Sequence, residues 1–262
     1  MFENGSALET LSLVASAAAA GLINAVAGGG TLLTFPSLLL CGTPPLVANA
    51  TSTLALFLGT GGGVLGYRRQ FAPIKPWLWR FIPVSILGGY AGSWLLTHTS
   101  DRTFSRLVPF LILFATVLFL SQGLIRRIAG VHESGSAEPS TAMIRGAIVF
   151  QLFVSVYGGY FGAGIGILML ASLGLIGLSD IHEMNALKTV LAALINLVAS
   201  AQFVFAGLID WPKTGLMTAG ALVGYFVGSY FSQRIPQSRM RQLISAIGVA
   251  IASWTFYKEF LR

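Results

Sequence analysis

Long apolar segments alternate with short polar ones along almost the whole chain. Each long segment has about 20 residues, the length that an α-helix needs to cross a hydrocarbon core of about 30 Å. The long segments are residues 8–27, 46–66, 77–97, 104–125, 143–163, 184–206, 213–233 and 239–258. Two shorter ones, 31–41 and 167–178, leave open whether they span or re-enter. Because a bilayer requires backbone polar groups to be satisfied internally, these segments are helices. The pattern predicts an all-α polytopic membrane protein.

The second half of the chain repeats the first at a constant offset of 136 positions. Identical residues recur without any gap, and most of them are glycines and small polar residues within apolar runs. Examples are Gly28 and Gly164, Asn49 and Asn185, Thr53 and Thr189. Backbone geometry and polar placement are therefore what repeats. Such a pattern is typical of a transporter with two homologous halves and a site at their interface.

Basic residues in the loops predict how the helices are oriented. If the loop with Arg68 and Arg69 is cytoplasmic, ten basic loop residues lie inside and five outside, with Lys188 set aside as a helix residue. This bias places both termini outside. Each half has about five helical segments and an odd number of crossings, so we expect two inverted-topology repeats. They would be residues 1–126 and 143–262, joined by a polar cytoplasmic linker, 127–142.

Two glycine clusters break the helices at equivalent points of the halves. The first ends in Gly28, Gly29 and Gly30 before Thr31, and the second contains Gly164 and Gly166. Glycine costs a helix about 1 kcal/mol relative to alanine, so the chain turns readily here. A short helix should start after each cluster, with unpaired N–H groups and its positive dipole end forming a cradle for an anion. The alternative is that the glycines allow close helix packing.

The packing interpretation is favoured for glycines spaced by four in two other segments. These are Gly88, Gly92, Gly220, Gly224 and Gly228.

A polar stripe marks one helix of each half. Its members keep to one helical face, which we expect to face the bundle interior or a water-filled path. They are Asn49, Ser52, Thr53 and Thr60 in the first half and Asn185, Lys188, Thr189 and Asn196 in the second. The alternative role is hydrogen bonding between helices, above all for Thr60 and Asn196.

Lys188 is the only ionisable residue predicted well inside a spanning helix, and such a residue suggests a functional site. We interpret it as the counter-charge of an anion. The alternatives are snorkelling to the surface or pairing with Asp180 or Glu183.

Composition and charge exclude several classes of protein. Hydrophobic residues make up 55% of the chain and charged residues 10%, which excludes a soluble domain. The net charge of +7 lies in loops between apolar segments and indicates topology, not nucleic-acid binding. A single cysteine, Cys41, excludes an internal disulfide and a multi-cysteine metal site. Motifs of nucleotide-binding loops, metalloproteases and serine hydrolases are missing, so we predict no enzyme activity, no cofactor and no metal.

Residues 24–69 and their degenerate second copy, residues 161–196, resemble the sulfite exporter TauE/SafE family, also called the toluene sulfonate uptake permease family. The resemblance covers essentially the whole chain. It rests on the glycine break, the following Phe-Pro, a proline-containing loop and an Asn-Ala-Thr-Ser helix start. The second copy lacks the triple glycine and the proline, so the halves should contribute unequally.

The resemblance implies an inner-membrane transporter of a sulfur-containing anion such as sulfite, sulfoacetate or another sulfonate. Alternatives are a transporter of another small anion, such as a carboxylate, or a membrane assembly subunit. The lipid bilayer and a small anion are the expected partners. The sequence leaves open which anion is carried, its direction, any coupling ion, and whether the protein forms homo-oligomers.

Overall fold

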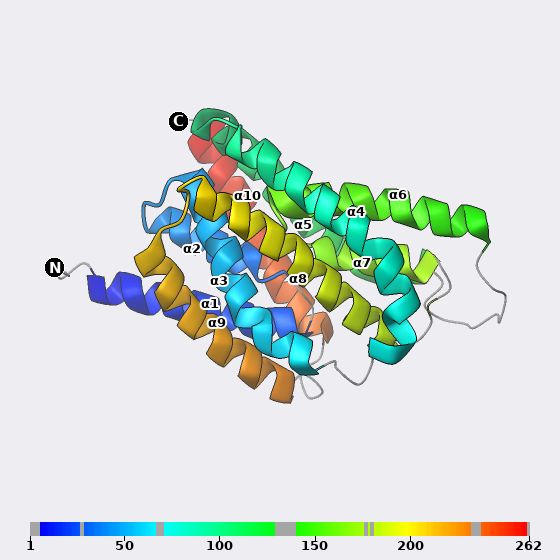
Figure 1. Ribbon diagram of the computed structural model, residues 1–262. Helices are drawn as coiled ribbons and strands as arrows, with labels where there is room; N and C mark the ends of the chain where they lie inside the picture. Colours follow the sequence, from blue (N-terminus) through cyan, green and yellow to red (C-terminus); the bar gives the residue numbers. More distant parts are fainter. Residues whose placement is uncertain are drawn as a thin grey trace.

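The computed structural model describes residues 6–26, 29–66, 71–128, 140–175, 178, 181–231 and 237–260. Within these ranges the chain forms ten α-helices and no strand (Figure 1). In chain order the helices are α1 (Ser6–Val26), α2 (Thr31–Leu40), α3 (Pro45–Gly66), α4 (Phe71–Thr97), α5 (Asp101–Ile128), α6 (Thr141–Tyr160), α7 (Ile165–Leu175), α8 (Ile181–Phe205), α9 (Trp211–Phe231) and α10 (Gln237–Phe260).

Every apolar segment expected from the sequence is a helix, so the all-α prediction is confirmed. The largest difference is at α4, which begins at Phe71 rather than near residue 77. Pro73 lies in its first turn, where the missing N–H has no intrahelical partner to lose. Helices α5 and α6 also reach into both ends of the expected linker, 127–142. Residues 129–139 lie outside the described chain.

The helices of the two halves pack in a reciprocal way. Helix α1 packs against α9, and α6, the equivalent of α1, packs against α4, the equivalent of α9. In the same way, α3 packs on α9, and its equivalent α8 packs on α4. The equivalent helices α3 and α8 also contact each other, as do α5 and α10. Each half therefore completes the other, and the halves meet mainly where α1 packs on α9 and α6 on α4, as well as along α3 and α8. The opposite orientation of the halves in a membrane remains a prediction.

Glycines allow the closest of these helix pairs to form. A Cβ added to Gly88 or Gly92 of α4 would collide with the backbone of α6. At the equivalent positions, Gly224 and Gly228 of α9, it would collide with the backbone of α1. The same holds for Gly220, which lies against the Val14 carbonyl. The prediction that these five glycines serve close packing is confirmed.

Lys213, at the start of α9, holds one end of the bundle together. Its Nζ donates hydrogen bonds to Thr43 Oγ1 at 2.9 Å and to the Cys41 carbonyl at 3.3 Å. The same atom lies 3.4 Å from the Glu9 carboxylate. The start of α1, the end of α2 and the start of α9 thus lie together, while α6 begins at the far end in Figure 1.

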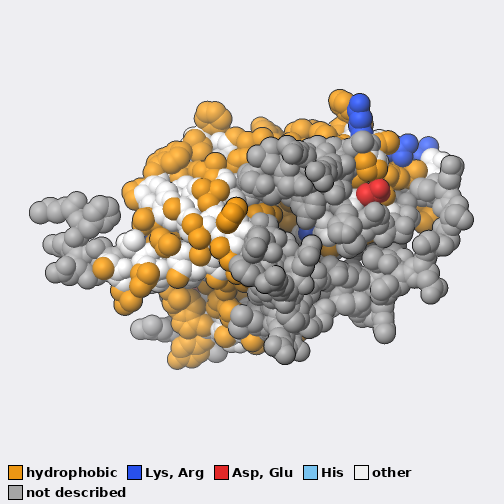
Figure 2. Space-filling view, turned by 90° about the horizontal axis from the view of Figure 1, so that it is seen from below, with side chains coloured by type: hydrophobic (Ala, Val, Ile, Leu, Met, Phe, Trp, Pro, Cys, Tyr) orange, Lys and Arg blue, Asp and Glu red, His pale blue; other side chains and the backbone are white. Residues whose placement is uncertain are grey.

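Large apolar side chains cover much of the described surface (Figure 2). Among them, Phe153, Val223 and Phe226 are each more than 60% exposed. Three helices of the described chain also combine the length and the apolar composition that a membrane crossing requires: Ala7–Ala25, Thr141–Tyr160 and Glu183–Phe205. Water would make such a surface unfavourable, whereas lipid would not. The fold is that of a polytopic membrane protein.

Candidate functional site

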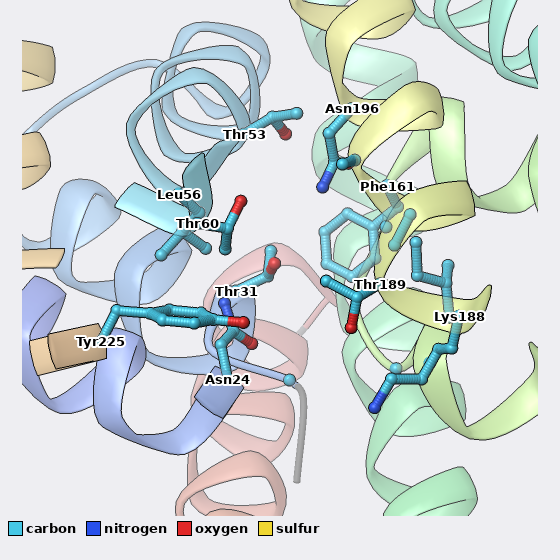
Figure 3. A pocket seen from close by; sticks show the side chains of 17 residues that line it. Asn24, Thr31, Thr53, Leu56, Thr60, Phe161, Lys188, Thr189, Asn196 and Tyr225 are labelled. Carbon is cyan, nitrogen blue, oxygen red and sulfur yellow. The ribbon is translucent and has the colours of Figure 1, made fainter. Parts of the chain in front are cut away.

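A cavity of about 100 Å³ lies between the two halves, at the level of both helix breaks. Figure 3 shows α3 on one side, with Thr53, Leu56 and Thr60, and α8 on the other, with Lys188, Thr189 and Asn196. The first half contributes Asn24, Gly29, Thr31, Thr53, Leu56 and Thr60. The second half contributes Phe161, Gly162, Gly164, Ile165, Gly166, Lys188, Thr189, Ala192, Ala193, Asn196 and, from α9, Tyr225.

Equivalent residues of the two halves face the same cavity. Thr53 and Thr189 are 136 positions apart, as are Thr60 and Asn196, and all four line it. Helices α3 and α8 therefore turn corresponding faces toward each other. The prediction that the stripes face the bundle interior is confirmed for these four residues.

The first break, between α1 and α2, depends on a glycine with a positive φ. Gly29 has a φ of 99° and lines the cavity, whereas Gly28 lies outside the described residues. Gly30 is buried and does not line the cavity, and its N–H donates to Asn24 Oδ1 at 2.8 Å. The next residue, Thr31, lines the cavity, and its N–H makes no hydrogen bond within the described part of the chain. One donor of the first α2 turn is thus available at the cavity.

The second break, between α6 and α7, repeats this arrangement. Gly162 and Gly164 both have a φ of 80°, a conformation that favours glycine. The Ala163 carbonyl accepts a hydrogen bond from the Tyr157 hydroxyl at 2.7 Å, which fixes the turn. The N–H groups of Gly164 and Gly166 have no hydrogen bond to any described residue. Two helix N-termini, each with a partial positive charge, therefore reach the cavity from opposite halves.

Lys188 is the basic residue among the described residues of the cavity wall. Its stem passes over Gly166, where an added Cβ would lie 3.4 Å from Lys188 Cδ. Its Nζ donates to Asn185 Oδ1, one turn earlier on α8, at 3.0 Å. Of the two acidic partners considered from the sequence, Asp180 lies outside the described residues and Glu183 lies in the first turn of α8, so pairing with either stays a prediction. The structure therefore brings together Lys188 and Gly166, the second residue of α7.

Three of the polar residues expected at the site do not line the cavity. Asn49 donates from Nδ2 to the Tyr160 carbonyl at 3.0 Å, and Ser52 Oγ lies 2.6 Å from Thr34 Oγ1. Asn185 Oδ1 accepts a hydrogen bond from Lys188 Nζ. For Asn49 and Ser52 the structure thus favours the alternative role, hydrogen bonding between helices.

Sequence reasoning missed three polar or aromatic lining residues, besides the apolar and glycine ones. Asn24 lies four residues before Gly28, and Phe161 lies three residues before Gly164, so their positions beside the breaks were a usable signal. Tyr225 lies on α9, and its hydroxyl points toward Asn24 and Thr31 in Figure 3. Sequence reasoning considered the stripes of α3 and α8 alone, although Thr214, Thr218 and Tyr225 share one face of α9.

The lining is rich in hydrogen-bond donors. It offers an ammonium, several hydroxyls and amides, and backbone N–H groups, all of which donate hydrogen bonds. No aspartate, glutamate or histidine is among the described residues that line it. No group of three potential metal ligands occurs among the described residues either.

Comparison with known proteins agrees with this architecture. The family described as sulfite exporter TauE/SafE matches residues 13–255. A probable membrane transporter protein of Haemophilus influenzae is 27% identical over 241 residues, which cover 92% of this chain and 91% of the relative. A probable membrane transporter protein of Sinorhizobium is 28% identical, with 92% and 89% covered, and one of Escherichia coli strain K12 is 26% identical, with 89% and 83% covered. No solved structure matches the chain significantly. Since the family match spans nearly the whole sequence, the chain belongs to the sulfite exporter TauE/SafE family of membrane transporters.

Proposed function

We propose that the protein carries a small sulfur-containing anion, such as sulfite, sulfoacetate or another sulfonate, through the cavity between its halves. The observation that carries the proposal is the position of Lys188 beside the N-terminus of α7, in a cavity whose described lining residues include no carboxylate. A cation or a zwitterion would find no counter-charge in such a lining. The proposal is one of transport without chemical conversion.

The charges of the cavity match those of such an anion. An oxyanion loses strong hydration when it enters a membrane protein. Each helix N-terminus offers about half an elementary charge, and the available N–H groups at Thr31, Gly164 and Gly166 supply directed donors. Lys188 supplies a whole charge, and hydrogen bonds between charged groups are about twice as strong as neutral ones. Together these groups replace the lost water.

The apolar part of the lining suits an anion with a short organic body. Leu56, Phe161 and Ala192 lie between the polar positions of α3, α8 and the second break. A sulfonate carries its charge at one end and carbon at the other, so both surfaces would be in contact with substrate. The cavity volume of about 100 Å³ is below that of pockets for drug-sized ligands, so only a small anion would fit.

The missing carboxylate also bears on the energetics of transport. Proton coupling through an acidic residue would require one in the path, and the described lining has none. Export of an anion needs no coupling ion, because a potential of 100 mV, negative inside, favours exit by about 2.3 kcal/mol per charge. Uptake would need a driving ion or consumption of the substrate. We propose the cell inner membrane as the location, with both termini outside.

The test is anion flux by the purified protein in liposomes. Sulfoacetate and malonate form a matched pair, since they differ by a sulfonate in place of one carboxylate. We expect saturable flux of radiolabelled sulfoacetate or sulfite that exceeds the flux of malonate. Equal or faster malonate flux would instead indicate a carboxylate transporter. No flux of any of these anions would favour a membrane assembly subunit.

A further inference from the structure

Asn49, in the first half, holds the end of a helix in the second half. Its Nδ2 donates to the carbonyl of Tyr160, the last residue of α6, at 3.0 Å. The Asn49 side chain is buried, so this hydrogen bond is shielded from water. The last carbonyls of a helix have no intrahelical partner, and this amide satisfies one of them. Asn49 thereby positions the chain that continues through Phe161 and Gly162 along the cavity wall.

The equivalent residues of the other break are arranged differently. Adding 136 to Asn49 gives Asn185, and subtracting 136 from Tyr160 gives Asn24. Both equivalents are described, and no hydrogen bond joins Asn185 to the Asn24 carbonyl. Asn185 instead accepts a hydrogen bond from Lys188 Nζ at 3.0 Å. One amide of the pair supports a helix break, and the other holds the cavity lysine.

The Asn49 contact is incomplete. Its Oδ1 is buried and has no hydrogen-bond partner in the described part of the chain. A buried acceptor without a partner is unfavourable, so this arrangement does not satisfy Asn49 fully. The reciprocal packing of the halves makes the exchanged arrangement, with Asn185 at the first break, available to the same residues.

We propose that Asn49 and Asn185 are positioning residues that exchange roles between two states of the transporter. In the state seen here, Asn49 supports the second break and Asn185 holds Lys188. In the other state, Asn185 donates to the Asn24 carbonyl and Asn49 releases Tyr160. Such an exchange follows when two inverted repeats alternate between equivalent conformations. The inference rests on the proposed transport function.

Substrate links the two states through Lys188. An anion in the cavity competes with the neutral Asn185 Oδ1 for the ammonium, and a charged acceptor forms the stronger hydrogen bond. Binding of the anion therefore frees the Asn185 amide to move to the first break. The loaded cavity would thus favour the change of state.

The test compares the two asparagines through the accessibility of the cavity and needs no substrate. The reporter is Thr60→Cys on the cavity wall, in a Cys41→Ser background. A membrane-impermeant maleimide is applied to vesicles of both orientations, and the ratio of the two modification rates is measured. Asn49→Leu removes the donor to Tyr160. Asn185→Asp keeps an acceptor for Lys188, but an ionised carboxylate cannot donate to Asn24.

We expect the two substitutions to shift the ratio in opposite directions, each by about fivefold, the effect of one hydrogen bond on a two-state population. Gln202→Leu is the matched control, because Gln202 Nε2 also donates to a carbonyl of the other half, that of Tyr90, at 3.1 Å. It should leave the ratio unchanged. If Asn49→Leu does not insert, a shift by Asn185→Asp alone still supports the proposal.

Shifts in the same direction, or no shift with Asn185→Asp, would overturn the exchange. This failure differs from a failure of the proposed function. A protein with normal sulfoacetate flux but no opposite shifts would refute the exchange alone. Opposite shifts without any anion flux would refute the proposed substrate class alone.

Discussion

Gly224 of α9 lies directly against the backbone of Ala18 in α1. A Cβ at Gly224 would collide with the Ala18 carbonyl oxygen, so the two helices approach without a side chain between them. The equivalent contact in the other half is made by Gly88 against Ser155 and its neighbours in α6. These two helix pairs join the halves. A methyl group at either glycine would prevent the close approach of its helix pair.

Gly224→Ala should therefore destabilise the protein. Overpacking of this kind costs about 1–3 kcal/mol, and here backbone atoms would have to move. The expected result is a lower midpoint of thermal unfolding for the detergent-purified protein. Gly215→Ala, on the same helix, is the control, because nothing lies within 4 Å of its added Cβ. Equal midpoints for both variants would show that the α1–α9 contact is looser than described.

Gly29→Val should abolish transport while the protein still folds. A β-branched residue at a φ of 99° is strained, and its side chain would occupy the cavity. Gly42→Val tests strain alone, since Gly42 has a φ of 73° with open space around it, far from the cavity. We expect both variants to be extractable and only Gly42→Val to retain sulfoacetate flux. Unchanged substrate affinity of Gly29→Val would show that the first break serves helix packing and not substrate binding.

The two termini and the central linker should lie on opposite sides of the membrane. The excess of basic residues in the loops expected on the cytoplasmic side predicts this orientation. Tags at either end and within 129–139 would be probed in intact cells and in permeabilised cells. The terminal tags should react in intact cells and the linker tag only after permeabilisation. Reaction of the linker and either terminus from one side would contradict the inverted topology.

Helix positions were readable from the sequence because each helix is a nearly pure apolar run bounded by glycine, proline or charge. The short helices α2 and α7 follow the two glycine clusters as expected. The partner of each helix was not readable. That α1 packs on α9 and α6 on α4 depends on glycine-lined surfaces whose partner the sequence does not specify.

The candidate site was readable only in part. The helical period shows that Asn49, Ser52 and Thr53 share one side of α3, but several helices pack around that side. Thr53 therefore faces the cavity, while Ser52 contacts Thr34 of α2 and Asn49 contacts the end of α6. Successive side chains of a helix point in directions about 100° apart, and this rotation decides which neighbouring helix each one contacts. The sequence pattern does not reveal which helices those neighbours are. Tyr225 reaches the cavity for the same reason, from α9.

The central claim is that an anion binds beside Lys188, and sulfoacetate flux by Lys188→Gln in liposomes tests it most directly. Loss of a charged hydrogen bond of about 1.5–3 kcal/mol predicts a flux at sub-saturating substrate that is lower by about 10- to 100-fold. Lys188→Arg should keep part of the binding but transport slowly, and both variants should insert normally. Lys75→Gln, which removes an exposed lysine of α4, should keep wild-type flux. Wild-type flux by Lys188→Gln would contradict the account.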